Sequence, residues 1–361
     1  MKTFHCSRCE HIVFFENTFC NRCHALLGYI PACREMCAFE GNDENGWTPL
    51  ATFTTIFYRR CLNYSRENVC NWMIPASDPS ELCDSCRLTR IIPTMSNSKN
   101  RLYWYRLEQA KRRLLFTLSA IGLPVYFPDS VTDGPLTFDF LEDYSGGEAV
   151  MTGHTNGRIV INLREADDIE REKIREWAGE GYRTVLGHMR HESGHFYFTH
   201  LIAETKRVGA FRLKFGDERA SYTECLNRHY TRDMQSGERL GFISDYASMH
   251  PLEDWAETWS HYLHMIDAVD TANGCGLALR PTNPLDPTTI CETIIERSSF
   301  DALLSRWQAI IYAVNILNRS LGLMDAYPFS LSVDAVDKLR FVHDVIAETR
   351  LPCQSKARPP L

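Results

Sequence analysis

The sequence predicts an α+β fold in which a cysteine-rich N-terminal region precedes a mainly helical domain that contains a small β-sheet. Three observations predict this arrangement. Ten of the 14 cysteines lie within the first 86 residues, mostly in CxxC pairs. Short strand-like segments end near residue 163, and amphipathic patterns of helical period dominate the rest of the chain. One of these helical segments, residues 182–203, carries the spacing His-Glu-x-x-His.

The composition indicates a globular protein with reduced cysteines. With 361 residues, 44% of them hydrophobic, the chain can fill a sizeable core. The formal net charge of -7 gives no general attraction to nucleic acid or to an anionic membrane. No apolar run approaches the length of a membrane span, and residues 1–9 lack the apolar stretch of a signal peptide. We therefore expect a cytoplasmic protein whose cysteines bind metal rather than form disulfides.

The first cysteine group predicts a zinc ribbon. Two CxxC pairs are separated by ten residues that include the strand-like stretch 12–15. Each pair can bend two thiolates onto one tetrahedral ion, and a short hairpin joins the pairs. Four thiolates leave no open position on the metal, so we expect this zinc ion to be structural. The predicted ligands are Cys6, Cys9, Cys20 and Cys23.

A second cysteine group also predicts a metal site, but its spacing is less typical of one. Its closing CxxC pair has the usual spacing but its opening pair is wider, so the sequence predicts one or two structural zinc ions in all. Cys33 and Cys37 could replace two of the ligands, or be ordinary small buried residues. A strand is expected at residues 51–58. The predicted ligands of the second ion are Cys61, Cys70, Cys83 and Cys86.

The remaining chain predicts helices around a small sheet. Asn156-Gly157 is a typical hairpin turn, and Lys111-Arg112-Arg113 favours a solvated helix face over a nucleic-acid contact. The predicted domains are a zinc-ribbon region at 1–95, a helical domain at 96–352 and a tail at 353–361. Helices are expected at 100–121, 165–177, 300–317 and 333–349, and strands at 136–141, 149–152 and 158–163.

The His-Glu-x-x-His spacing predicts a catalytic zinc site. Histidines four residues apart lie about 40° apart around a helix and one turn along it, so His191 and His195 can reach one ion. Glu192 then flanks the metal, where it can take a proton from a water whose pKa the zinc lowers to about 7. An extended substrate commonly pairs with an edge strand beside such a site, and residues 158–163 are the candidate strand.

The third protein ligand is expected from a second helix. The metzincin pattern would require Gly at 198 and His at 201, but the chain has Phe198 and Leu201. Residues 249–267 instead predict a helix that carries two acids on one face. Glu253 is the predicted third ligand, and Glu257, one turn later, is the predicted carboxylate that orients a ligand histidine. The reverse assignment of these two acids stays open.

Peptide hydrolysis also needs a hydrogen-bond donor for the developing oxyanion. Tyr246 lies shortly before Glu253 in the chain and is the predicted donor. His250 is the alternative donor, and Tyr246 would then be a packed aromatic residue.

Several longer motifs resemble a known family. They are the first four cysteines, Thr152-Gly-His154, Glu165-Ala-Asp-Asp168, residues 182–195, Phe215-Gly-Asp-Glu218 and residues 250–264. Over about residues 1–345 the chain resembles the bacterial family of zinc-ribbon, zinc-binding metallopeptidases. The resemblance implies an N-terminal zinc ribbon and a gluzincin-like, zincin-type catalytic domain. Phe196-Tyr197-Phe198 stands where Tyr-Tyr-Trp is expected, a departure that leaves the metal-binding residues unchanged.

Together these observations predict a zinc metallopeptidase with one catalytic zinc ion and one or two structural zinc ions. Glu192 is expected to act as general base and then as proton donor, while Tyr246 and the zinc stabilise the oxyanion. A protein or peptide is the expected substrate, and the ribbon is expected to bind a protein partner or to present substrate. The alternative is a zinc-ribbon adaptor or nucleic-acid-binding protein whose metal site does not hydrolyse peptides.

Overall fold

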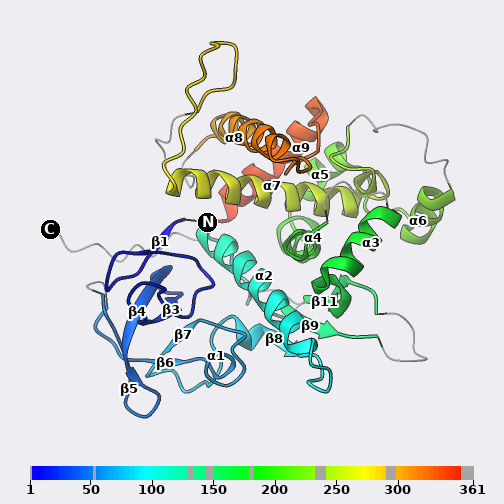
Figure 1. The fold of residues 1–361 in the computed structure, drawn as a ribbon. Helices are drawn as coiled ribbons and strands as arrows, with labels where there is room; N and C mark the ends of the chain where they lie inside the picture. Colours follow the sequence, from blue (N-terminus) through cyan, green and yellow to red (C-terminus); the bar gives the residue numbers. More distant parts are fainter. Residues whose placement is uncertain are drawn as a thin grey trace. The chain divides into compact units, whose positions relative to one another are not determined.

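The computed structural model of the chain (Figure 1) divides into two units. The first comprises Met1–Phe116, Thr137–Gly153 and Arg158–Ile174, and the second comprises Thr117–Leu136, His154–Gly157 and Arg175–Leu361. Helix α2 (Asn100–Ala120) belongs to both units, because the division falls between Phe116 and Thr117. The structure describes residues 2–51, 54–128, 134–143, 150–178, 183–231, 241–289 and 298–350.

The cysteine-rich part of the first unit is built from two antiparallel sheets. Strands β1 and β2 pair Phe4 with Val13, and the second sheet has the order β3-β4-β5-β6-β7. The ring of Phe15 lies 4.9 Å from that of Tyr29 and 5.4 Å from that of Phe116 on α2, so aromatic packing joins these elements. The strands are β1 Phe4–His5, β2 Ile12–Val13, β3 Leu26–Ile30, β4 Glu35–Asn42, β5 Gly46–Pro49, β6 Tyr58–Arg60 and β7 Met73–Pro75.

The predicted strand at 51–58 is wrong over most of its described length. Strand β6 begins only at Tyr58, and residues 52–53 lie outside the part that the structure describes. Ile56 and Phe57 are 50% and 57% exposed. Side chains of high β-propensity form a strand when they fit a half-buried sheet surface, and these two have none to pack against.

The other sheet of the first unit has the order β10-β11-β9-β8, and β9 is parallel to both β11 and β8. The predictions at 136–141 and 158–163 are confirmed. Asn156 and Gly157 have φ angles of 49° and 73°, the left-handed pair that a two-residue hairpin turn requires, so that prediction is confirmed too. The strands are β8 Thr89–Ile91, β9 Thr137–Leu141, β10 Gly153–Thr155 and β11 Arg158–Asn162.

Two expectations for this sheet are wrong. The strand predicted at 149–152 lies further along the chain, at Gly153–Thr155, because the hairpin turn fixes which residues pair; residue 149 itself is outside the described part. Strand β11 lies between β10 and β9, so it is an inner strand and not the free edge expected for pairing with substrate.

Helices build most of the second unit, and α4 and α7 meet closely within it (Figure 1). A Cβ atom on Gly194 of α4 would lie 2.9 Å from the Cα atom of Ala256 on α7, so glycine permits the close approach. Trp255 donates to the Gly194 carbonyl at 2.8 Å and Trp259 to the Ser193 hydroxyl at 3.1 Å. These bonds satisfy two indole N–H groups that are buried in the core.

The expected long helices at 100–121, 300–317 and 333–349 are confirmed. No helix of the described residues is long and apolar enough to span a membrane. The helices besides α2 are α1 Leu62–Ser65, α3 Asp168–Ala178, α4 Val185–Phe198, α5 Val208–Phe215, α6 Tyr222–Thr231, α7 Pro251–Gly274, α8 Phe300–Ser320 and α9 Val333–Thr349. A π-helical turn, Thr199–Ala203, continues α4, and 3-10 turns lie at Cys86–Leu88, Leu163–Ala166 and Tyr246–Ser248.

The basic run on α2 is not a solvated face. Lys111 is 0% exposed and Arg112 is 1% exposed, so the expectation for these two residues is wrong. Arg113 is partly exposed and pairs with Glu16 at 2.6 Å. Lys111 is buried beside Thr89 of β8 and its helix neighbour Glu108, and Arg112 is buried beside the Val69 carbonyl of the cysteine-rich segment.

Candidate metal centres

The two histidines of the His-Glu-x-x-His segment meet one acid of α7. The Nε2 atom of His191 lies 3.0 Å from Oε2 of Glu253, and the Nε2 atom of His195 lies 3.6 Å from the same oxygen. Ligand atoms from all three residues lie within 4.8 Å of one another. We call this group the His/Glu centre. Its geometry follows from the helix: residues four apart share a face of α4, and that face meets the first turn of α7.

The His/Glu centre fits a zinc ion. Glu253 is 3% exposed, and a carboxylate buried to this degree needs positive charge beside it. Burial opposes its ionisation, but the hydrogen bonds from His191 and His195 outweigh burial and hold the pKa of Glu253 well below its usual range. Two imidazole nitrogens and one carboxylate oxygen are a donor set that catalytic zinc takes, with a fourth position left open.

Glu257 contacts the far side of the His191 ring. Its Oε1 atom lies 2.7 Å from Nδ1 of His191, and its Oε2 atom accepts a hydrogen bond from Ser244 at 2.7 Å. Burial opposes ionisation of Glu257 too, but the hydrogen bond from His191 outweighs burial and lowers the pKa of Glu257 to about 2. Glu253 is therefore the acid that faces both Nε2 atoms, and Glu257 is the acid that faces Nδ1.

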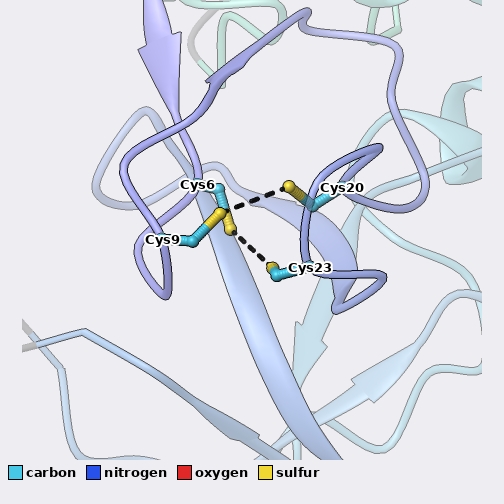
Figure 2. A group of neighbouring side chains, drawn as sticks. All are labelled: Cys6, Cys9, Cys20 and Cys23. Carbon is cyan, nitrogen blue, oxygen red and sulfur yellow. Dashed lines mark hydrogen bonds between the residues drawn. The ribbon is translucent and has the colours of Figure 1, made fainter.

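In the first cysteine group each CxxC pair lies in one turn: Cys6 and Cys9 between β1 and β2, and Cys20 and Cys23 before β3 (Figure 2). The Cys6 and Cys23 sulfurs are 3.7 Å apart, and the Cys9 and Cys20 sulfurs are 3.6 Å apart. All four sulfurs lie within 4.8 Å of one another. This is the closed, four-sulfur arrangement that suits structural zinc.

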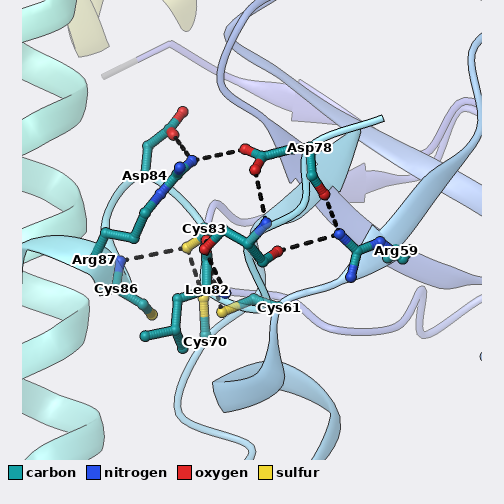
Figure 3. A network of polar contacts seen from close by, with 10 residues as sticks. Arg59, Cys61, Cys70, Asp78, Leu82, Cys83, Asp84, Cys86 and Arg87 are labelled. Atoms are coloured by element: carbon teal, nitrogen blue, oxygen red, sulfur yellow. Dashed lines mark hydrogen bonds and ion pairs between the residues drawn. The ribbon is translucent and has the colours of Figure 1, made fainter. Parts of the chain in front are cut away.

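The second cysteine group is also assembled, and it is fully buried. The Cys70 and Cys83 sulfurs are 3.7 Å apart, and Cys61 and Cys86 complete a group whose sulfurs lie within 4.8 Å of one another. Its loop is fixed by Arg87, which donates to Asp78 at 2.9 Å (Figure 3). The group therefore fits a second four-sulfur site.

Cys33 and Cys37 belong to neither group. Cys37 is buried on β4, with its sulfur 3.4 Å from the Ser7 hydroxyl, as expected for a small core residue. Cys33 is exposed, so that expectation is wrong for it.

Comparison with known proteins agrees with this geometry. Residues 100–345 match the family described as "Putative zinc-binding metallo-peptidase", and residues 3–97 match a zinc-ribbon domain. The chain belongs to this metallopeptidase family. It is 38% identical over 349 residues to an uncharacterized protein of Mycobacterium tuberculosis and to one of Mycobacterium bovis, with 96% of each chain covered. No solved structure gives a match.

Two tyrosines lie beside the His/Glu centre of this metallopeptidase family member. Tyr246 was predicted from the sequence, and its ring centroid lies 5.9 Å from that of His191. Tyr222, from α6, was missed; its hydroxyl interacts with the Glu253 carboxylate and with the Tyr246 hydroxyl, as the pKa shifts of both tyrosines show. Burial, with the charge of Glu253, raises the pKa of Tyr222 to about 12 and that of Tyr246 further. Both hydroxyls therefore keep their protons at neutral pH and can donate.

Glu192 is buried on α4 next to His191, and its charge contributes to the raised pKa of both tyrosines. His250, the alternative donor, has other partners: its Nδ1 accepts from the Leu252 amide and its Nε2 donates to the Ala220 carbonyl, both at 3.1 Å. It caps α7 and holds the segment that leads into Tyr222.

A further histidine of this unit was also missed. The ring centroid of His154, at the hairpin before β11, lies 6.3 Å from that of His195. Burial lowers the pKa of His154 to about 4, and its Nε2 accepts a hydrogen bond from the Gly157 amide at 3.1 Å. His154 is therefore neutral, with its proton on Nδ1. The Thr-Gly-His motif was the sequence signal that could have identified it.

Proposed function

We propose that the chain is a zinc-dependent peptidase that hydrolyses peptide bonds at the His/Glu centre. The observation that carries this proposal is the meeting of two imidazoles from α4 and one carboxylate from α7 within 4.8 Å, next to the buried Glu192. Zinc bound by these side chains would lower the pKa of a water molecule to about 7 and polarise the substrate carbonyl. We further propose three zinc ions per chain, one at this centre and one at each cysteine group.

The chain's own residues would move the protons and orient the groups. Glu192 is proposed to take the proton of the attacking water and to pass it to the leaving amine. The hydroxyl of Tyr246 is the proposed donor to the oxyanion. Tyr222 is proposed to hold Glu253 in position and, through its interaction with Tyr246, to orient the Tyr246 hydroxyl. Glu257 is proposed to hold the His191 ring so that Nε2 faces the metal.

A protein or peptide is the proposed substrate. We propose that the zinc ribbon binds a protein partner or part of the substrate, because Ile12 and Phe14 on its surface are 63% and 71% exposed. Nucleic acid is not a proposed partner, since Lys111 and Arg112 are buried and the net charge is -7. Free thiols in both cysteine groups favour a reducing compartment such as the cytoplasm.

The test compares the wild-type protein with Glu192→Gln on a mixture of peptides, with new termini identified by mass spectrometry. The glutamine variant is expected to retain its zinc and to lose peptide cleavage by at least about 100-fold, because the amide cannot accept the proton. Glu176→Gln, an exposed acid of α3, is the matched control. Equal cleavage by wild type and Glu192→Gln would contradict the proposed role. Absence of cleavage by both zinc-loaded proteins would favour a non-hydrolytic adaptor.

A further inference from the structure

Two adjacent cations of α2 are buried within the first unit. Lys111 and Arg112 are 0% and 1% exposed, whereas the side chain of Arg113 is 40% exposed. An unpaired buried charge costs several kcal/mol, so each buried cation needs a partner of opposite charge. The partners of the two residues differ in kind.

Lys111 has a carboxylate partner. Its Nζ atom lies 2.8 Å from Oε2 of Glu108, which is equally buried, and it donates to the Thr89 hydroxyl. Thr89 in turn donates to Oε1 of Glu108 at 2.7 Å. The positive charge of Lys111 is thus matched within one turn of α2.

Arg112 has no carboxylate at ion-pair distance among the described residues. Its guanidinium donates to the Val69 carbonyl at 2.7 Å, one residue before Cys70, and its Nε atom has no hydrogen-bond partner there. Burial by itself would lower the pKa of Arg112, but the negative charges of Cys70, Glu108 and Cys86 raise it. Because Val69 directly precedes Cys70, the guanidinium lies beside the second cysteine group.

The second cysteine group carries more negative charge than the other groups around it neutralise. Four thiolates around one Zn²⁺ have a formal charge of about −2, by the usual charges of these ligands. Amide groups of Trp72, Cys83 and Cys86 donate to its sulfurs at 3.4 to 3.5 Å and spread part of that charge. All four cysteines are at most 2% exposed, so water cannot solvate the rest.

We propose that Arg112 is a built-in counter-cation for the metal site formed by Cys61, Cys70, Cys83 and Cys86. It follows that zinc binding at this site and the packing of α2 at Arg112 depend on each other. Loss of the zinc-bound thiolates would leave the buried guanidinium of Arg112 with less opposite charge beside it. The inference rests on the proposed zinc ion at the second cysteine group, and it is independent of peptide hydrolysis.

The first cysteine group serves as an internal control for the effect of Arg112 on the second. Cys9 and Cys23 are partly exposed, so water can solvate that site. The buried cations of the described residues are Lys111, Arg112, Arg190 and Lys338. Three of them pair with a carboxylate, whereas Arg112 donates to the carbonyl of the residue before Cys70. Only the second site should therefore respond to a change at residue 112.

The experiment measures zinc content and the rate of zinc release from the full-length chain. Arg112→Met removes the charge at similar volume, Arg112→Lys retains the charge, and Arg113→Met is the matched control on the same helix. Release is followed with a chromogenic chelator during thiol alkylation, and peptide mass mapping shows which cysteines react. Circular dichroism reports folding.

For Arg112→Met we expect zinc release from the second cysteine group to accelerate at least about tenfold, with release from the first group unchanged. Arg112→Lys and Arg113→Met should release zinc at close to the wild-type rate. Zinc release at the wild-type rate by a folded Arg112→Met variant would overturn the inference. It would also be overturned if Arg112→Lys released zinc as fast as the methionine variant. If Arg112→Met does not fold, Arg112→Lys decides: release from the second group close to the wild-type rate supports the inference, and release at least about tenfold faster overturns it. A wild-type chain that holds no zinc at the second group would instead remove the proposed site itself.

Discussion

The Nδ1 atom of His191 lies 2.7 Å from Oε1 of Glu257, while Nε2 of the same ring lies 3.0 Å from Glu253. Glu257 is fixed from its other side by the Ser244 hydroxyl at 2.7 Å. With a zinc ion at the centre, a histidine held in this way would keep its proton on Nδ1 and direct the lone pair of Nε2 towards the ion. The orientation of His191 therefore depends on α7 as much as on α4.

Glu257→Gln should weaken zinc binding at the His/Glu centre by about 10- to 100-fold, because the amide retains an acceptor but not the charge that strengthens the bond. Competition with a chelator of known affinity measures the change. Asp270→Asn, further along α7, is the control and should bind zinc as the wild type does. Wild-type affinity in Glu257→Gln would show that this carboxylate does not tune the centre.

Tyr246→Phe should lower kcat for a cleaved peptide by about 100- to 1000-fold with little change in KM, because one oxyanion donor is lost. Tyr222→Phe leaves the Tyr246 hydroxyl in place but removes a hydroxyl that interacts with Glu253, so its effect on kcat should be smaller. Steady-state kinetics on the same peptide separates the two. Tyr312→Phe, an exposed position on α8, is the control. Equal kcat values for Tyr246→Phe and wild type would assign the tyrosine to packing alone.

Gly194→Ala should destabilise the protein by about 1–3 kcal/mol, because the new methyl group would lie 2.9 Å from the Ala256 backbone and force α4 and α7 apart. The same shift should lower zinc content at the His/Glu centre and leave the cysteine groups loaded. Urea unfolding and metal analysis measure the two effects. Gly209→Ala on α5 has no atom within 4 Å of the new Cβ, so it should be neutral or slightly stabilising. Equal stability of both variants would contradict this account of the helix contact.

Stability should fall as the pH falls from about 6.5 towards 4, partly through His261. Its Nδ1 lies 2.5 Å from the Tyr327 hydroxyl, and burial lowers its pKa from 6.5 to about 4. Between these values the unfolded chain binds a proton that the folded chain excludes, so the loss approaches about 1.4 kcal/mol per pH unit. Above pH 6.5 the contribution is constant. Urea unfolding at pH 7.5, 6 and 5 should show a shallower pH dependence for His261→Phe than for wild type, and parallel curves would contradict the assignment.

Local patterns in the sequence predicted most of what local geometry decides. The spacing of His191 and His195 and the helical spacing of Glu253 and Glu257 each fix which side chains share a helix face. The CxxC spacings act in the same way for the cysteine groups. What the sequence did not reveal depends on residues distant in the chain: Tyr222 reaches Glu253 across about thirty positions without any periodic signal.

The main error of prediction from the sequence was to expect Lys111 and Arg112 to be exposed. Three basic residues in a row resemble a solvated face because the cost of burying them is high. Lys111 and Arg112 are nevertheless buried, since Glu108 and Thr89 lie beside the first and the Val69 carbonyl lies beside the second. The exposed stretch before β6 shows the converse, because residues of high β-propensity there have no sheet surface to cover.

The packing of α2 has a practical consequence for any fragment cut to residues 100–345, the part that matches the metallopeptidase family. Such a fragment would keep the His/Glu centre, but Arg112 would lose Val69 and the thiolates, and the ring of Phe116 would lose Phe15 and Tyr29. A newly exposed mixture of cationic and aromatic side chains promotes aggregation. Poor activity in a trimmed protein would then reflect insolubility before it reflected chemistry.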